Sequence, residues 1–317
     1  MGGMSSAPKR VSRALPVLAL ILAAAFAARL VGLAAVPPRW DEGWSIAHAS
    51  LPISELLRVT AADVHPPLYY LALGVWQRIA GQNLFAVRFF GVLVSLLCVP
   101  LAYVVATAWT GRRGLFPLLA AGAMAWLPLA VYYSAVARMY ALAPAFVLLA
   151  AWGALRTTDN TSTRGDIPRD SPGADRLGQE VLQKDVWPER RAGLAFVLGA
   201  VGAMLTLYHA VWPLAGLGVY ALARARGPQR RRLLVWAAIA AGLYAPWALY
   251  AVPQLLGRAA AEGATNIGQQ FSVGYFVENG LIGLTMAQWV GWFGVAAHGL
   301  LIGLGALAAQ RRRALWL

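Results

Sequence analysis

Long apolar runs separated by short polar segments constrain this chain more than any other feature of its sequence. Hydrophobic residues make up 59% of the 317 residues and charged residues only 13%, a balance that excludes an ordinary soluble domain. Several runs approach or exceed the roughly 20 residues that a helix needs to cross a bilayer. We therefore predict an all-α, multi-pass membrane protein. The runs predicted to span are residues 14–36, 84–109, 115–133, 141–155, 192–208, 211–223, 233–250 and 284–309.

The excess of basic residues indicates how these spans are oriented. Lys and Arg number 27 against 13 Asp and Glu, which gives a net charge of +14, and basic residues gather in the cytoplasmic loops of membrane proteins. A full crossing by residues 66–80 would put the basic segments 112–113, 156–191 and 224–232 outside. If residues 66–80 instead form a juxtamembrane or re-entrant helix on the outer face, all three segments lie inside.

We adopt the second topology, with about eight spans and both termini in the cytoplasm. It predicts one membrane-embedded core over residues 1–317, a first extracytoplasmic loop over residues 37–83 that holds juxtamembrane helices, and a flexible cytoplasmic loop over residues 156–191. A cleavable signal peptide is the alternative for the first run, because Ala25-Phe26-Ala27 resembles a cleavage site. The run continues beyond that point, which favours a retained helix.

The first outer loop concentrates acids and histidines. Asp41 and Glu42 follow a Pro-Pro break, and His65 precedes a second Pro-Pro and the pair Tyr69-Tyr70. One of the two carboxylates, Asp41, is a candidate general base, with its neighbour as a positioning or pKa-tuning partner. A structural role is the alternative, in which the acids cap the next helix and favour the positive end of its dipole. For the two tyrosines the alternative to a catalytic role is a place in the aromatic belt at the membrane interface, where tyrosine is common.

Arg88 and Arg138, near the predicted outer ends of spans, are more informative. A charged side chain at membrane depth is costly and therefore functional by default, and the positive-inside rule does not account for cations on the outer face. Guanidinium groups suit phosphate, and His65 and His209 are candidates to join them. Snorkelling toward lipid headgroups is the alternative for the arginines, and a structural role for the histidines. The sequence thus predicts an outward-facing site for a lipid phosphate rather than for a soluble nucleotide, which a glycine-rich phosphate loop would indicate.

At these residues the chain resembles the GT-C glycosyltransferases, specifically the family 39 group that includes protein O-mannosyltransferases and the aminoarabinose transferases acting on lipid A. The matching pieces follow the family order across roughly the first half of the chain. They are Asp41-Glu42 after the first helix, His65-Pro66-Pro67-Leu68-Tyr69-Tyr70, Val87-Arg88-Phe89, Tyr133-Ser134 with Arg138 and Tyr140, and then the Tyr208-His209 turn. Where the family often has Ser-Gln-Glu-x-Arg-x-Tyr, residues 134–140 read Ser-Ala-Val-Ala-Arg-Met-Tyr, without the two polar residues.

The resemblance implies inverting transfer of a sugar, mannose-like or other, from a polyprenyl-phosphate donor to a hydroxyl of a protein, glycan or lipid acceptor. The reaction would take place on the extracytoplasmic face of the cell membrane. In the roles carried over, the catalytic pair is Asp41 with Glu42, the donor-phosphate ligands are His65, Arg88, Arg138 and His209, and the supporting residues are Tyr69, Tyr133 and Tyr140.

No metal ligand is assigned, and a divalent metal is left open as a cofactor. The expected partners are membrane lipids, the donor and the acceptor, and no nucleic acid. Two alternatives stand beside the enzyme. One is a transporter or flippase of a lipid-linked substrate, and the other is a truncated, non-catalytic relative, since family members usually continue through more spans.

The predicted topology has a direct test. In a Cys98→Ser background, which removes the one native cysteine, His65→Cys should react with a membrane-impermeant maleimide added outside. Arg112→Cys should react only once the reagent reaches the cytoplasmic face. Labelling of both positions from outside would contradict the orientation.

Overall fold

The computed structural model describes residues 14–111, 113–158 and 174–261, with side chains except at 174–189 and 259–261. The predicted span 284–309 lies outside the described residues. The chain divides into two compact units, Met1–Gln254 and Leu255–Leu317, where the sequence predicts a single core. All the elements below belong to the first unit, except the last residues of the final helix.

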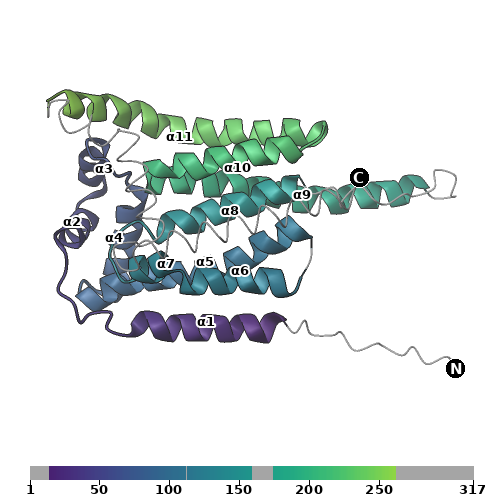
Figure 1. Cartoon of the computed structure of the whole chain (residues 1–317). Coiled ribbons are helices and arrows are strands. Elements are labelled where there is room, and N and C mark those ends of the chain that lie inside the picture. Colours follow the sequence, from purple (N-terminus) through teal and green to yellow (C-terminus); the bar gives the residue numbers. More distant parts are fainter. Residues whose placement is uncertain (1–13, 112, 159–173, 262–317) are drawn as a thin grey trace, which may run out of the picture. The chain divides into compact units, whose positions relative to one another are not determined.

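All secondary structure in the described residues is helical (Figure 1). The elements are α1 (Ala14–Leu30), α2 (Trp40–Ala49), α3 (Ile53–Ala61), α4 (Leu68–Ala80), α5 (Leu84–Thr110), α6 (Leu115–Trp126), α7 (Pro128–Ser134), α8 (Leu142–Thr157), α9 (Ala174–Thr206), the short 3-10 helix η2 (Tyr208–Ala210), α10 (Val211–Arg224) and α11 (Pro228–Ala261).

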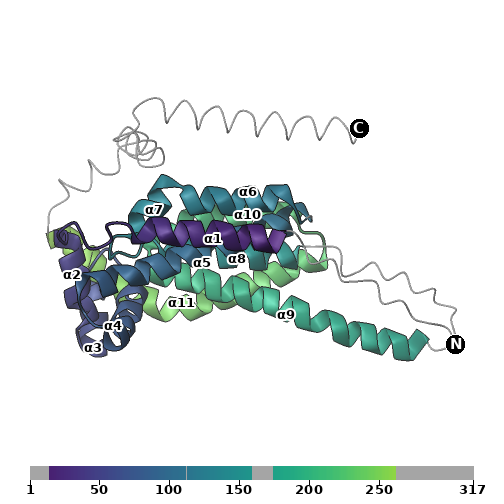
Figure 2. The same ribbon diagram turned by 90° about the horizontal axis from the view of Figure 1, so that it is seen from below.

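Within the first unit the helices form a bundle with a cap at one end. In Figure 1 and Figure 2, α1, α5, α8, α9 and α10 run along a common direction, whereas α2, α3 and α4 gather at one end. The main packing pairs are α8 with α9, α5 with α8, and α5 with α6. A hydrophobic cluster joins the cap to the bundle; its buried members are Ala49, Leu56, Tyr69, Tyr70, Leu73, Val87, Ala137 and Met139. The cap contains Asp41, Glu42, His65 and Tyr69, and the end of the bundle next to it contributes Arg88, Tyr133, Arg138 and Tyr140.

The long apolar helices indicate a membrane protein. By length and composition, α5 and the stretch Pro228–Arg258 of α11 can each cross a bilayer, and the bent pair α6 and α7 makes a third candidate if it is one broken span. Helices α1 and α8 are apolar but shorter, with 17 and 16 residues. Helix α4 has 13 residues, well short of the roughly 20 that span the hydrocarbon core. The described residues therefore show two or three candidate spans rather than eight.

Two predicted segments differ in the structure. The predicted span 115–133 bends by 50° between α6 and α7, because Pro128 has no N–H to continue the helical ladder. The predicted flexible loop 156–191 is helical from Ala174 onward, as the start of α9. Its polar composition suggested a loop, but a helix needs apolar residues only where it packs, and Leu, Gln, Glu, Lys and Arg all have good helix propensity.

Arg29, the charge that interrupts the first apolar run, is buried between helices. Its Nε donates to Ser95 Oγ on α5 at 3.2 Å, and its Nη1 donates to the Ala125 carbonyl at the end of α6 at 2.9 Å. Only 2% of the side chain is exposed. These hydrogen bonds offset the cost of a cation at membrane depth and tie α1 to α5 and α6.

Gly91 lets α5 pass against the end of α7. A Cβ at this position would lie 2.7 Å from the Ser134 carbonyl oxygen, closer than van der Waals contact allows. Ser134 is the last residue of α7 and directly precedes the loop with Arg138. The absence of a side chain at Gly91 therefore sets where that loop begins.

Gly91→Ala should destabilise the protein by about 1–3 kcal/mol, the usual cost of overpacking. Gly122→Ala is the matched control, because nothing lies within 4 Å of a Cβ there and it is also inside a helix. Both variants gain about 1 kcal/mol of helix propensity, so only the packing differs. Thermal unfolding in detergent should show a lower midpoint for Gly91→Ala alone, and equal midpoints would disprove the packing argument.

Candidate functional site

Glu42 and Arg88 form a buried ion pair between α2 and α5. Arg88 Nε lies 2.9 Å from Glu42 Oε1 and Arg88 Nη2 lies 2.7 Å from Oε2, which is the bidentate geometry that strengthens guanidinium–carboxylate contacts. The exposed fractions are 5% for the Arg88 side chain and 0% for Glu42. Asn83 starts α5 by accepting the Ala86 N–H at 2.9 Å, so Arg88 sits in the second turn and reaches the cap.

Two backbone groups complete the Glu42 carboxylate. Oε1 accepts the N–H of Ala137 at 2.9 Å, and Oε2 accepts the N–H of Arg39 at 3.0 Å. Arg39 is the N-cap residue of α2 and Glu42 is its third helical residue, so the second contact is one half of a capping box. Glu42 thus caps α2, which is the structural role that the sequence left open for the two acids. The same carboxylate also binds Arg88 of α5 and the backbone of the loop after α7.

The pKa of Glu42 lies below its ordinary value. Burial by itself raises this pKa, but the hydrogen bonds from Arg88, Ala137 and Arg39 and the charge of Arg88 outweigh it. Glu42 is therefore ionised at neutral pH. With four donors around its two oxygens, it has little capacity left to act as a base.

The Arg88 guanidinium is saturated by protein acceptors. Besides the two bonds to Glu42, Nη1 donates to the Leu33 and Val36 carbonyls, both at 2.9 Å, and Nη2 to the Pro37 carbonyl at 3.4 Å. A guanidinium has five N–H groups, and each has an acceptor here. In this arrangement Arg88 holds the chain between α1 and α2 and leaves no N–H for a phosphate.

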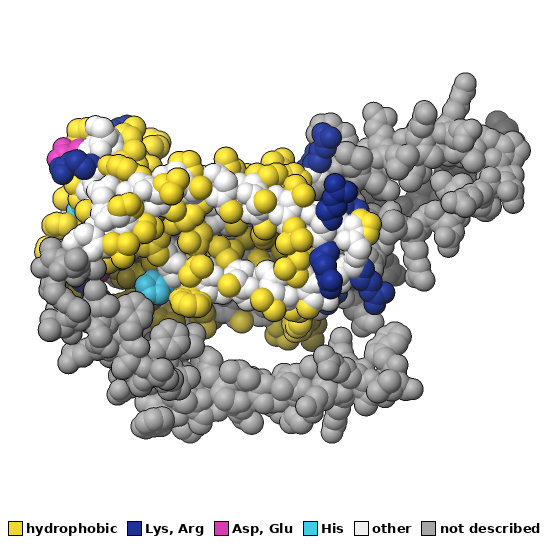
Figure 3. All heavy atoms as spheres, turned by 90° about the horizontal axis from the view of Figure 1, so that it is seen from above, with side chains coloured by type: hydrophobic (Ala, Val, Ile, Leu, Met, Phe, Trp, Pro, Cys, Tyr) yellow, Lys and Arg dark blue, Asp and Glu magenta, His cyan; other side chains and the backbone are white. Residues whose placement is uncertain are grey.

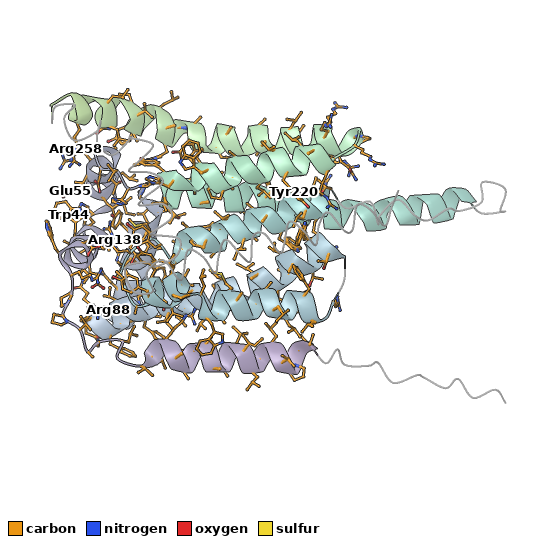
Figure 4. All side chains as sticks on the ribbon, viewed as in Figure 1. Trp44, Glu55, Arg88, Arg138, Tyr220 and Arg258 are labelled. Atoms are coloured by element: carbon orange, nitrogen blue, oxygen red, sulfur yellow. The ribbon has the colours of Figure 1, made fainter. Side chains whose placement is uncertain are left out.

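Arg138 is the cation at the centre of the candidate site (Figure 4). Its Nε lies 3.6 Å from Asp41 Oδ2, its Nη1 reaches the Asp41 carbonyl at 3.3 Å and Ser45 Oγ at 3.4 Å, and its Nη2 lies 3.2 Å from His65 Nε2. Nε has no hydrogen-bond partner although it is buried. Unlike Arg88, this guanidinium has an unsatisfied donor, and its partner Asp41 is 48% exposed.

The contacts of His65 select a tautomer for its neutral ring. A guanidinium N–H can only donate, so the Nε2 that faces Arg138 acts as the acceptor and the proton of the neutral ring sits on Nδ1. Nδ1 faces Asp63 Oδ2 at 3.4 Å, and Asp63 Oδ1 accepts the Val64 N–H at 2.8 Å. Asp63 therefore orients the imidazole toward Arg138.

The tyrosines assigned as supporting residues separate into two groups. The rings of Tyr133 and Tyr140 are tilted by 49° with centroids 4.5 Å apart, and the Tyr140 centroid lies 6.0 Å from the Arg138 guanidinium carbon. Tyr69 is instead a core residue, 2% exposed, packed on Tyr70 and Phe90. Tyr133 and Tyr140 are half-buried beside Arg138, whereas Tyr69 is enclosed.

His209 does not join the Arg138 group. It lies in η2 with its side chain exposed, and no hydrogen bond or ion pair links it to the described residues. Its neighbour Tyr208 accepts the Trp247 Nε1–H at 3.1 Å. Where the structure describes the chain, no group of three or more His, Cys, Asp or Glu side chains could hold a metal ion.

Three residues of this site were not predicted from the sequence: Ser45, Asp63 and Tyr70. Ser45 follows Asp41 by four positions, the spacing that places two residues on one helix face, and Asp63 precedes His65 by two. Burial raises the pKa of the Tyr70 hydroxyl to about 12, although the Arg138 charge lowers it. That hydroxyl has no hydrogen-bond partner among the described residues, so it is a neutral donor close to the cation.

Comparison of the chain with protein-family models, with curated proteins and with solved structures gave no match.

Glu42→Gln should lower the free energy of unfolding by about 1.5–3 kcal/mol at neutral pH, the value of hydrogen bonds to a charged group. Because the folded pKa is depressed, the stabilisation by Glu42 is complete above its unfolded pKa of about 4.3 and is lost as the pH falls through the folded pKa. The deficit of the variant should therefore shrink below about pH 4. Thermal unfolding in detergent against pH measures this, with exposed Glu55→Gln as control. A deficit that does not change with pH would contradict the assignment.

Proposed function

We propose that the protein is a membrane glycosyltransferase that moves a sugar from a polyprenyl-phosphate donor to an acceptor hydroxyl. The observation that carries the proposal is the Arg138 group, in which a buried guanidinium with an unsatisfied Nε meets a half-exposed carboxylate and an oriented imidazole. Such a transfer requires a general base for the acceptor hydroxyl and cations that stabilise the departing phosphate.

In the proposed reaction Asp41 is the general base. It takes the proton of the acceptor hydroxyl as that oxygen bonds to the anomeric carbon of the sugar. The bond from this carbon to the donor phosphate breaks, and its electron pair stays on the phosphate oxygen. Asp41 fits this role better than Glu42, because its side chain is 48% exposed and makes one long contact to Arg138, whereas Glu42 is enclosed and fully bonded.

Arg138 and His65 are the proposed ligands of the leaving phosphate. Arg138 can offer its free Nε–H to the anion. His65 can donate to the same oxygens only when it is protonated, because in the neutral ring Nε2 accepts from Arg138. Tyr70 can add a neutral O–H. Charge stabilisation of this kind is usually the largest contribution to catalysis.

Glu42 and Arg88 take a positioning role in this proposal. Their ion pair holds the start of α2, with Asp41, against the loop that carries Arg138. The acid and the cation of the reaction thus depend on one buried contact, although neither Glu42 nor Arg88 touches the substrate.

The proposal includes the topology of about eight spans with the cap facing outward. It is supported by the shortness of α4 and by the basic end of the first unit. The turn from α10 to α11 carries Arg224, Arg226 and Arg230–Arg232, whereas the cap mixes the acids Asp41, Glu42, Glu55 and Asp63 with arginines. Basic residues mark the cytoplasmic side.

Asp41→Asn should reduce sugar transfer by about 10²–10⁴-fold, the usual contribution of a general base, without loss of folded protein. Purified protein would be assayed with radiolabelled polyprenyl-phosphate sugars and a panel of peptide, glycan and lipid acceptors. Glu55→Gln is the control, since Glu55 is also 48% exposed and pairs with exposed Arg58. Arg138→Lys should also lose activity, because one ammonium cannot replace the planar guanidinium. Absence of transfer by the parent protein, or full activity of Asp41→Asn, would refute the proposal.

A further inference from the structure

A cavity lies at the other end of the first unit from the cap. It has a volume of about 620 Å³ and is lined by Thr157 at the end of α8, Arg190 on α9, Gly227, and then Pro228, Arg231, Arg232, Val235 and Trp236 on the first turns of α11. Arg88 and Arg138 are at the cap end of the bundle in Figure 4, so this cavity is separate from the proposed reaction site.

The lining combines cations with an apolar wall. Arg190, Arg231 and Arg232 contribute three guanidinium groups, and Val235 and Trp236 contribute the wall. The Trp236 ring lies directly over Gly193 of α9, where any Cβ would collide with it. The cavity lining therefore offers positive charge together with the apolar surface of an indole.

Two of the three guanidinium groups have no protein partner in the described residues. Neighbouring arginines do: Arg224 donates to the Tyr220 hydroxyl at 3.0 Å, and Arg230 Nε donates to the Leu222 carbonyl at 3.3 Å. The guanidinium groups of Arg190 and Arg231 form no hydrogen bond or ion pair with any described side chain or backbone group. Both line the cavity and are available to an external anion.

The cavity borders an apolar, exposed helix face. Beyond Val235, α11 exposes Ile239, Leu243 and Leu249 by 41%, 60% and 78%. Figure 3 shows this face as a hydrophobic surface that ends in basic side chains over the turn from α10 to α11. A ligand that fits both features has an anionic group, which lies among the arginines, and a hydrocarbon part, which lies along α11.

We propose that this cavity binds the phosphate headgroup of an anionic phospholipid, with the acyl chains lying along α11. Basic pockets between helices at the cytoplasmic surface suit such headgroups, guanidinium groups bind phosphate through paired N–H donors, and Trp236 has the amphipathic character typical of the headgroup level. The inference shares the proposed orientation of the chain, with this end at the cytoplasmic surface, but not the proposed transfer reaction, because the two sites share no residue.

The test compares lipids on the full-length protein in neutral detergent, with saturable thermal stabilisation as the readout. The probes are dioleoyl-phosphatidylglycerol, dioleoyl-phosphatidylcholine and inorganic phosphate. Phosphatidylglycerol should stabilise the parent saturably, and the other two should not. Stabilisation by inorganic phosphate to the same extent would overturn the lipid assignment in favour of a free anion. No saturable stabilisation by phosphatidylglycerol would overturn the site.

Matched variants separate the cavity from general surface charge. Arg190→Gln with Arg231→Gln should weaken phosphatidylglycerol binding by at least about tenfold, because two charge-assisted contacts are lost. Arg191→Gln with Arg226→Gln removes the same charge from exposed residues of the same region that do not line the cavity, and should leave the affinity within about twofold. All four positions are exposed, so both double variants should fold with the parent's midpoint in lipid-free detergent. An equal loss of affinity in the two double variants would overturn the proposal.

Discussion

The bidentate contact between Glu42 and Arg88 is the interaction on which the capped end of the molecule depends. One carboxylate orders the start of α2, anchors the loop after α7 through the Ala137 N–H and fixes the second turn of α5. The guanidinium in turn secures three carbonyls between α1 and α2. A buried ion pair stabilises a fold only when its remaining donors and acceptors are satisfied, and here the backbone supplies those partners. Segments nearly 100 residues apart in the sequence therefore meet at a single point.

The separation of roles between the two arginines follows from this contact. Arg88 and Arg138 are similarly buried, at 4% and 6% exposure, so burial alone would not distinguish a structural cation from a reactive one. The difference lies in the acceptors. Arg88 has an acceptor for each N–H, whereas Arg138 faces an exposed carboxylate and an imidazole and keeps a free Nε–H.

The sequence was sufficient to predict the membrane class, most helix positions and where the charged residues gather. It was less informative about the roles of those charged residues. Asp41, Glu42, His65, Arg88 and Arg138 do come together in the described structure. Glu42 and Arg88 were nevertheless assigned to chemistry, because a pairing across 46 positions depends on how α2 packs on α5, which no local pattern encodes. His209 shows the same limit, since a turn at the right depth does not specify which way its side chain points. Asp63 and Ser45 could have been found, because their spacing from His65 and Asp41 is visible in the sequence.

The hydrogen bonds of Arg29 link the order of synthesis to the order of assembly. Its carbonyl acceptor at Ala125 lies 96 positions later in the chain, at the point where α6 gives way to α7 and the break leaves backbone oxygens without their helical partners. Before α5 and α6 are made, the guanidinium has only the Ala25 carbonyl within its own helix. Helix α1 is thus synthesised well before the helices that supply the other acceptors of its buried arginine. A nascent chain must keep it near the translocation machinery, or near water, until α5 and α6 arrive.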